Sequence, residues 1–142
     1  MFIKQISIFV ENKPGRLADI TEILAKNDVD IRALSIADTT DYGVLRLIVN
    51  EPEKAQAALK EAGVTVSVTN VLGVCVSDTP GAFAKATRAI ADAGITLEYA
   101  YAFITPEKGS AFVILRVGDK EKAAAVLGEA GIRIISQKDI FA

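Results

Sequence analysis

The chain has 142 residues, of which 51% are hydrophobic and 24% charged, a composition typical of a folded globular protein. Its 16 basic and 18 acidic side chains form no long run of either sign, which disfavours binding to a nucleic acid. Histidine is absent, so the commonest general base and metal ligand is missing, and we expect no catalytic residue, metal site or cofactor.

The first half of the chain predicts a strand, a helix, a hairpin, a second helix and a last strand. Ile3 to Val10 is a short β-rich run, and the apolar residues after it recur at helical spacing until Asn27. Two β-branched runs, Asp30 to Ala37 and Val44 to Asn50, are separated by a short polar loop and predict the hairpin. The remaining elements are a helix closed by Gly63 and a strand over residues 64–68.

The second half repeats this order. ENKPGRLADITEILAKNDVDI, Glu11 to Ile31, recurs as SDTPGAFAKATRAIADAGITL, Ser77 to Leu97, and EKAQAALKEAGV, Glu53 to Val64, recurs as EKAAAVLGEAGI, Glu121 to Ile132. Each copy therefore reads βαββαβ, a pattern that usually packs two helices on one face of a four-stranded antiparallel sheet. We expect an α+β fold of two ferredoxin-like units in tandem, over residues 1–68 and 69–142.

The two units are joined without a flexible linker. VTVSVTNVLGVCVSD, Val64 to Asp78, runs from the last strand of one copy into the first strand of the next. The central strands are apolar on both faces, although helices cover only one. A large exposed apolar face is rare on a monomer, so we expect the helix-free faces to be covered and the protein to be a homodimer.

The Pro14-Gly15 and Pro80-Gly81 turns have the composition of an anion-binding helix start. Proline tolerates the first helical position, glycine allows a tight turn, and the first N–H groups of a helix lack intrahelical partners. Asn12 is a candidate helix cap, and Lys13 and Arg16 add positive charge that favours a carboxylate. The alternative is that each turn is only a well-formed helix start.

These segments resemble ACT domains. The resemblance is carried by two βαββαβ units, each with an N/D-x-P-G turn, an alanine-rich first helix and a strand beginning V-D-I or I-T-L, and it covers practically the whole chain. In that family the unit is a regulatory module that binds a free amino acid at an interface between two units, usually attached to an enzyme of amino-acid metabolism. The second copy departs from the pattern at Asp78, where the family has asparagine, and at Thr96.

The resemblance implies a ligand site in the first copy. It assigns the ligand's carboxylate to the backbone N–H groups of the first turn and its ammonium group to the start of the second strand. A carboxylate at Asp78 repels an anion unless it binds the ammonium group, so we expect unequal sites in the two copies. The candidate residues are Asn12, Lys13, Pro14, Gly15, Arg16, Leu17, Asp30, Ile31, Asp78 and Gly81.

The resulting prediction is a regulatory or sensor protein that binds a free amino acid, has no catalytic activity and acts on an enzyme or regulator of amino-acid metabolism. One alternative is a small hydrolase of acylphosphatase type, with Arg16 holding the phosphate, although the glycine-rich loop of that family is not matched. Another is RNA binding on an open sheet, which requires paired aromatic residues on adjacent central strands and a basic surface.

The remaining polar and aromatic residues favour structural roles. We expect Arg46 and Arg116 to be solvated strand charges, Cys75 to be an inert core thiol, and the alternating aromatic residues 99, 101 and 103 to pack on one strand face. A single cysteine excludes an intramolecular disulfide and a C-x-x-C metal site. The start MFIKQISIFVENK has no basic leader and no long apolar run, so we expect a cytoplasmic protein with no membrane contact.

Overall fold

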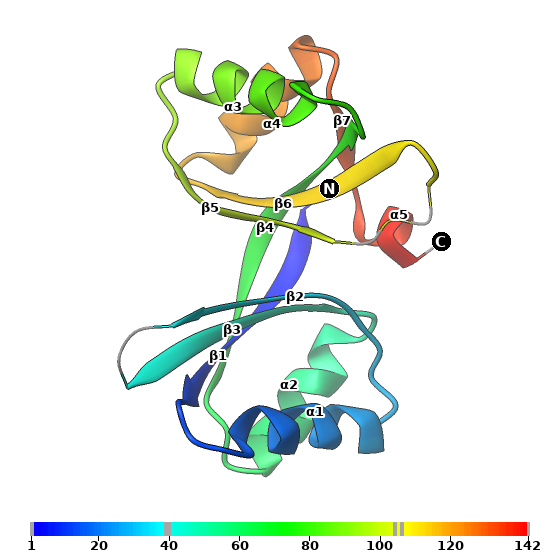
Figure 1. Cartoon of the computed structure of the whole chain (residues 1–142). Helices are drawn as coiled ribbons and strands as arrows, with labels where there is room; N and C mark the ends of the chain where they lie inside the picture. Colours follow the sequence, from blue (N-terminus) through cyan, green and yellow to red (C-terminus); the bar gives the residue numbers. More distant parts are fainter. Residues whose placement is uncertain (1, 39–40, 104, 106, 142) are drawn as a thin grey trace. The chain divides into compact units, whose positions relative to one another are not determined.

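The computed structural model describes residues 2–38, 41–103, 105 and 107–141. Lys4–Thr69 forms one compact unit, the N-terminal unit, and the other described residues form a second, the C-terminal unit (Figure 1). The first two helices of each unit lie on one side of that unit's strands (Figure 1). The α+β, ferredoxin-like fold predicted from the repeat is confirmed. The division into two domains over residues 1–68 and 69–142 stays a prediction.

The N-terminal unit follows the predicted order of elements. Its first three strands are antiparallel and lie in the order β2-β3-β1, with Ile6 opposite Leu47. The last strand, β4, begins in this unit and continues along the chain into the next without a break. The elements are β1 (Ile3–Glu11), α1 (Arg16–Lys26), β2 (Ile31–Asp38), β3 (Tyr42–Val49), α2 (Pro52–Glu61) and β4 (Val66–Ser77).

The C-terminal unit repeats the order and adds one helix. Its strands are antiparallel and lie in the order β7-β4-β6-β5. The short helix α5 has no counterpart in the first copy and was not expected from the repeat. The elements after β4 are α3 (Ala82–Asp92), β5 (Leu97–Phe103), β6 (Ser110–Val117), α4 (Lys120–Glu129), β7 (Arg133–Ile135) and α5 (Gln137–Phe141).

Local sequence explains where several helices begin and end. Pro52 occupies the first turn of α2, where a missing N–H costs no intrahelical hydrogen bond. Asp119 caps α4 by accepting a hydrogen bond from the Lys122 N–H at 3.1 Å. Helix α1 ends at Asn27, as predicted, and Asp28 then has a positive φ of 56°. None of the helices in the described residues is long and apolar enough to cross a membrane.

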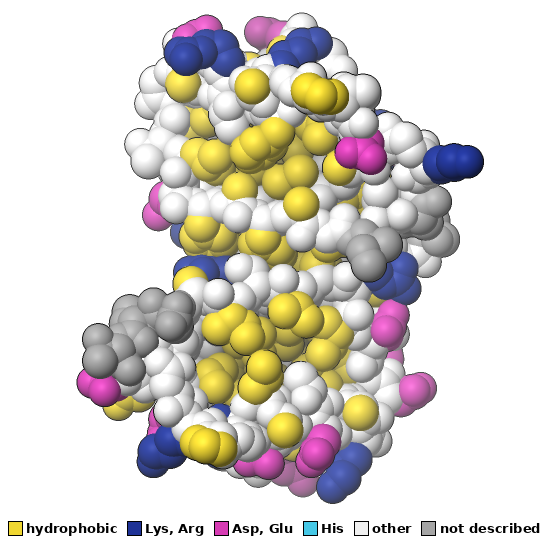
Figure 2. All heavy atoms as spheres, viewed as in Figure 1, with side chains coloured by type: hydrophobic (Ala, Val, Ile, Leu, Met, Phe, Trp, Pro, Cys, Tyr) yellow, Lys and Arg dark blue, Asp and Glu magenta, His cyan; other side chains and the backbone are white. Residues whose placement is uncertain are grey.

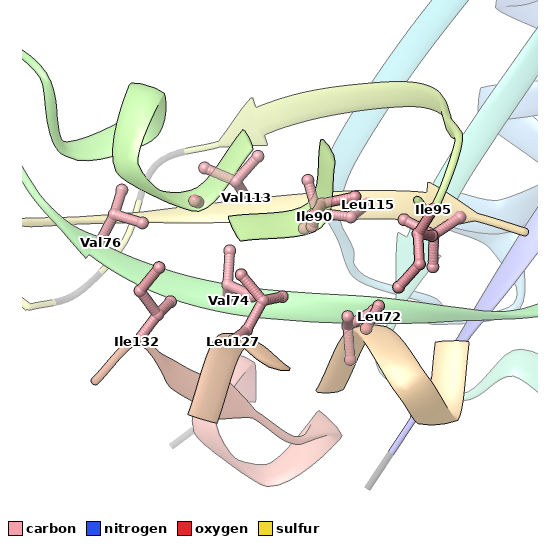
Figure 3. Close-up of a cluster of buried hydrophobic side chains, with 12 residues drawn as sticks. Leu72, Val74, Val76, Ile90, Ile95, Val113, Leu115, Leu127 and Ile132 are labelled. Carbon is pink, nitrogen blue, oxygen red and sulfur yellow. The ribbon is translucent and has the colours of Figure 1, made fainter. Parts of the chain in front are cut away.

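Each unit has its own apolar core between its helices and its sheet. In the C-terminal unit the strands supply Leu72, Val74, Val113 and Leu115, and their side chains meet Ile90 of α3 (Figure 3). Because side chains alternate along a strand, this spacing of two places the apolar set on the helix-covered face. The equivalent set in the N-terminal unit includes Ile6, Ile8, Val10, Leu45, Leu47 and Val49.

The register determines which side chains of the edge strands face the helices. Leu34 lies opposite Leu47, and Ile36 lies opposite Leu45. Directly opposite residues in an antiparallel pair share a face, so both edge residues belong to the helix-covered face. They are nevertheless 55% and 48% exposed, because they lie on the edge strand β2. This leaves an uncovered apolar strip beside α1.

Candidate functional site

The two Pro-Gly turns have the same backbone conformation. Gly15 and Gly81 are the N-caps of α1 and α3, and both have φ of 87°. A matching backbone hydrogen bond lies three residues before each glycine. The Asn12 N–H donates to the Asp41 carbonyl at 3.1 Å, and the Asp78 N–H donates to the Gly109 carbonyl at 3.0 Å. The N-cap residue of each helix is a glycine and has no side chain, so the expectation that Asn12 is the cap residue of α1 is wrong. A glycine in the left-handed region makes the turn instead.

Charges at the first turn are largely paired within the turn itself. Lys13 Nζ lies 2.9 Å from Glu11 Oε2, and Arg16 Nη1 lies 3.9 Å from Asp19 Oδ2. The hydrogen bond from Lys13, and its charge, lower the pKa of Glu11 below its ordinary value. The two cations expected to attract a carboxylate are therefore already close to carboxylates. Arg16 is the residue that a hydrolase would use to hold a phosphate, and its Nε is buried without a hydrogen-bond partner among the described residues.

Asp30 and Ile31 lie at the other end of the unit from this turn. Ile31 is opposite Val49, whereas the Asp38 end of β2 is opposite Gly43, next to the strand end that precedes the turn. The span from Ile31 to the Asp38 end is about 20 Å at the usual rise of a strand. Asp30 itself accepts a hydrogen bond from Arg32 at 3.0 Å, and its N–H donates to Asn50 at 2.9 Å. One small molecule does not reach both places within a single unit.

A groove opens beside the first turn, and we call it the first groove. Its volume is about 250 Å³. Apolar side chains from β1, α1 and β2 form its wall, and the paired Glu11 and Lys13 lie at its rim. The lining residues are Val10, Glu11, Asn12, Lys13, Leu17, Ile36 and Gly43.

A groove also opens at the equivalent place in the C-terminal unit, and we call it the second groove. Its volume is about 310 Å³. Val76, Phe83 and Val113 supply most of its large apolar side chains, and Asp78 lies at its rim beside two hydroxyl groups. The hydroxyl oxygens of Ser77 and Thr79 are 3.2 Å apart. In Figure 2, hydrophobic side chains gather between β5 and α3, and between β2 and α1, on the side of each unit that carries its groove.

The two grooves differ most at their edge strands. Ala100 lies opposite Leu115 and Ala102 lies opposite Val113, the register positions that Leu34 and Ile36 occupy in the first copy. Both alanines are exposed and line the second groove. Sequence reasoning missed this difference, although the signal was present: aligning the repeats through their Pro-Gly turns places alanine at both positions.

The other singled-out residues lie outside both grooves, except for Tyr101, which lines the second. Arg116 is 3.6 Å from Glu98, an exposed strand pair of the expected kind. Cys75 is opposite Phe112 on the face of β4 that does not carry α3 and α4, and it is partly exposed. The expectation of a core thiol is therefore wrong, because residues at alternate positions on β4 face the core and Cys75 falls between them. The rings of Phe103 and Phe112 meet edge to face, with centroids 5.8 Å apart.

A family comparison assigns the whole chain. Residues 1–142 match the model of the ACT domain pair. This chain belongs to the ACT domain pair family. The predicted resemblance is thus confirmed, and membership supports a regulatory, ligand-binding role.

Solved structures agree with this assignment. A protein of Bacteroides thetaiotaomicron is 39% identical to this ACT domain pair, with a TM-score of 0.92, and the match covers 99% of this chain and 96% of that one. The ligand-free regulatory subunit of aspartate kinase from Thermus thermophilus shares the fold, with 19% identity, a TM-score of 0.65 and coverage of 89% and 91%. Aspartate kinase of Clostridium acetobutylicum shares it over 91% of this chain and 33% of that one, with 14% identity and a TM-score of 0.53. No sequence among the curated proteins matches this chain.

Proposed function

We propose that this ACT domain pair is a regulatory protein that binds a free amino acid and has no catalytic activity of its own. The observation that carries the proposal is the groove beside each Pro-Gly turn, where an apolar pocket meets the first turn of a helix. The N–H groups of that turn lack intrahelical acceptors and suit a carboxylate, while the acidic side chain at the rim suits an ammonium group. An amino acid carries both charges on one small molecule.

The partner in this proposal is an enzyme or regulator of amino-acid metabolism. The Thermus thermophilus protein with the same fold is a regulatory subunit of aspartate kinase, which supports a role as a separate regulatory chain. We also propose a homodimer. Phe9 supports it, because this side chain alternates with the core residues Ile8 and Val10 and is 69% exposed on the helix-free face. A cytoplasmic location stays a prediction.

The predicted contact between the first-turn ligand and Asp30 requires a second unit. About 20 Å separates the two ends of β2, so Asp30 reaches a ligand at the turn only if it comes from another copy of the domain. In this proposal the first-turn residues Asn12 to Leu17 of one chain and Asp30 with Ile31 of its partner surround the ligand.

A thermal-shift screen against the twenty amino acids tests the proposed function. A ligand present at 100 times its Kd and bound only to the folded state adds about 2.7 kcal/mol, which corresponds to a rise in Tm of roughly 5–10 °C for a protein of this size. The proposal fails if none of the amino acids raises Tm. Hydrolysis of an acyl phosphate by the purified protein, lost in an Arg16→Ala variant, would replace it with the hydrolase alternative.

A further inference from the structure

We propose that the second groove binds an amino acid with a branched aliphatic or aromatic side chain, with the ligand's ammonium group at Asp78. This inference rests on the proposed function and names the ligand class and the groove. The sequence placed the ligand site in the first copy, whose Pro-Gly turn matches the family more closely, whereas this inference places a ligand in the second copy.

Space is the first reason. The first groove has Ile36 in its wall, and Leu34 lies beside it on the same face of the edge strand. At the equivalent register positions the second groove has the smaller side chains of Ala102 and Ala100, and its volume is about 310 Å³. That volume lies at the lower end of the range of small-molecule pockets, which suits a ligand of amino-acid size.

The chemistry of the wall is the second reason. Val76, Phe83, Ala111 and Val113 surround the space that the alanines leave open. These four side chains are apolar, so burying a polar group against them is unfavourable. Three of the polar lining residues, Ser77, Asp78 and Thr79, belong to the segment just before the Pro80-Gly81 turn, and Tyr101 is the fourth. Figure 2 shows the corresponding apolar hollow between β5 and α3. Branched aliphatic and aromatic side chains fit this environment, because they lose water-exposed apolar surface on entering it.

Charge at the rim is the third reason. In the first groove Lys13 lies 2.9 Å from Glu11, so that carboxylate already has a cation. Threonine replaces the lysine in the second copy, and within the described part of the chain no cation lies within ion-pair distance of Asp78. An ammonium group satisfies this carboxylate, whereas a second carboxylate on the ligand side chain would be repelled.

The ligand's own carboxylate has a place within the same groove. In the first turn of α3, Ala82 donates to the Thr79 carbonyl and Lys85 donates to the Gly81 carbonyl. The N–H groups between them, those of Phe83 and Ala84, fall where a helix has no intrahelical acceptor. Phe83 also lines the groove, so these donors and the apolar wall lie together. Ammonium, carboxylate and side chain are thereby assigned to three adjoining parts of one groove.

Isothermal titration of the full-length protein with leucine, phenylalanine and aspartate tests this assignment. We expect leucine or phenylalanine to bind and aspartate to bind at least about tenfold more weakly. The double variant Ala100→Leu, Ala102→Ile gives the second groove the edge-strand side chains of the first copy. It should bind leucine or phenylalanine, whichever the parent binds more tightly, at least about tenfold more weakly. The matched control is Ala91→Leu, an added side chain at an exposed position of α3 outside the groove, which should leave the affinity unchanged.

A second variant tests the assignment if the double variant with the filled groove does not fold. Asp78→Asn keeps the shape of the side chain and removes its charge, and the loss of a charge-assisted hydrogen bond predicts about 10- to 100-fold weaker binding. Tight binding that survives both Asp78→Asn and the filling of the second groove would overturn the assignment, as would a preference for aspartate. If the parent binds none of the twenty amino acids, the proposed function itself fails. If the parent binds an amino acid whose affinity neither variant changes, the assignment to the second groove fails and the proposed function stands.

Discussion

Gly73 on β4 lies opposite Ile135 on β7, and a methyl group added to Gly73 would come within 2.8 Å of Ile135 Cγ1. The same methyl group would also overlap the side chain of Ile3, which is fully buried. We therefore expect Gly73→Ala to lower the free energy of unfolding by roughly 1–3 kcal/mol, as overpacking does in other cores. Urea denaturation measures this change.

The matched control for that substitution is Gly128→Ala in α4. A methyl group there meets no atom within 4 Å, and alanine has a higher helix propensity than glycine. This variant should be more stable than the parent by about 0.5–1 kcal/mol. A neutral Gly73→Ala variant would show that Ile3 and Ile135 rearrange at little cost.

Substitution of Gly15 should lower stability through backbone strain and not through steric overlap. The φ of Gly15 is 87°, yet an added methyl group meets nothing within 4 Å. Alanine at this position should cost about 1–2 kcal/mol of unfolding free energy, because an L-residue is strained in the left-handed region. Asparagine tolerates that region better, so Gly15→Asn should cost less than Gly15→Ala. Equal stabilities of the two variants would contradict this explanation.

The carboxylate of Asp139 should contribute to the stability of the fold in a pH-dependent way. Its Oδ2 accepts hydrogen bonds from the Ser136 N–H at 2.8 Å and from the Ser136 hydroxyl at 3.1 Å. The backbone N–H of Ser136 is the main cause that lowers the pKa of Asp139 below its ordinary value. A lowered folded-state pKa stabilises the fold above the unfolded pKa, and this stabilisation is lost as the pH falls through the folded value.

The corresponding variant is Asp139→Asn. At pH 7 it should lower the free energy of unfolding by about 0.5–1 kcal/mol, and its difference from the parent should shrink below about pH 4. Denaturation at a series of pH values measures this. Lys138→Gln, which alters charge on the same helix and leaves the Asp139 acceptor in place, is the control. A difference that stays constant down to pH 3 would rule out the linkage.

A charged side chain at position 9 should disrupt the proposed homodimer. Phe9 lies opposite Val44 on the helix-free face and is 69% exposed. Phe9→Lys should give a monomer by light scattering at micromolar concentration, because burying an unpaired lysine at an interface is unfavourable. Val68→Lys is the control, since Val68 shares its face with Val66, which packs against the core. A monomeric parent, or a dimer that Phe9→Lys leaves intact, would count against this interface.

Much of the fold follows from local patterns in the sequence. The repeat of ENKPGRLADI as SDTPGAFAKA predicts two matching units, and helical spacing ending at Asn27 predicts the end of α1. Both patterns act over a few residues, where hydrophobic periodicity and turn chemistry dominate. Helix α5 escaped prediction, because a segment of five residues is too short to show a helical period.

The candidate site depended on long-range register and pairing. The sequence alone identified the Pro-Gly turns, and their glycines have the same positive φ in both copies. Only the tertiary structure showed that Asp30 lies at the far end of β2, because strand direction and register determine which residues meet. It also showed that Lys13 pairs with Glu11, and that Ala100 and Ala102 line the second groove whereas the larger Ile36 lines the first. Strand pairing joins residues far apart in the chain, and no short stretch of sequence contains that information.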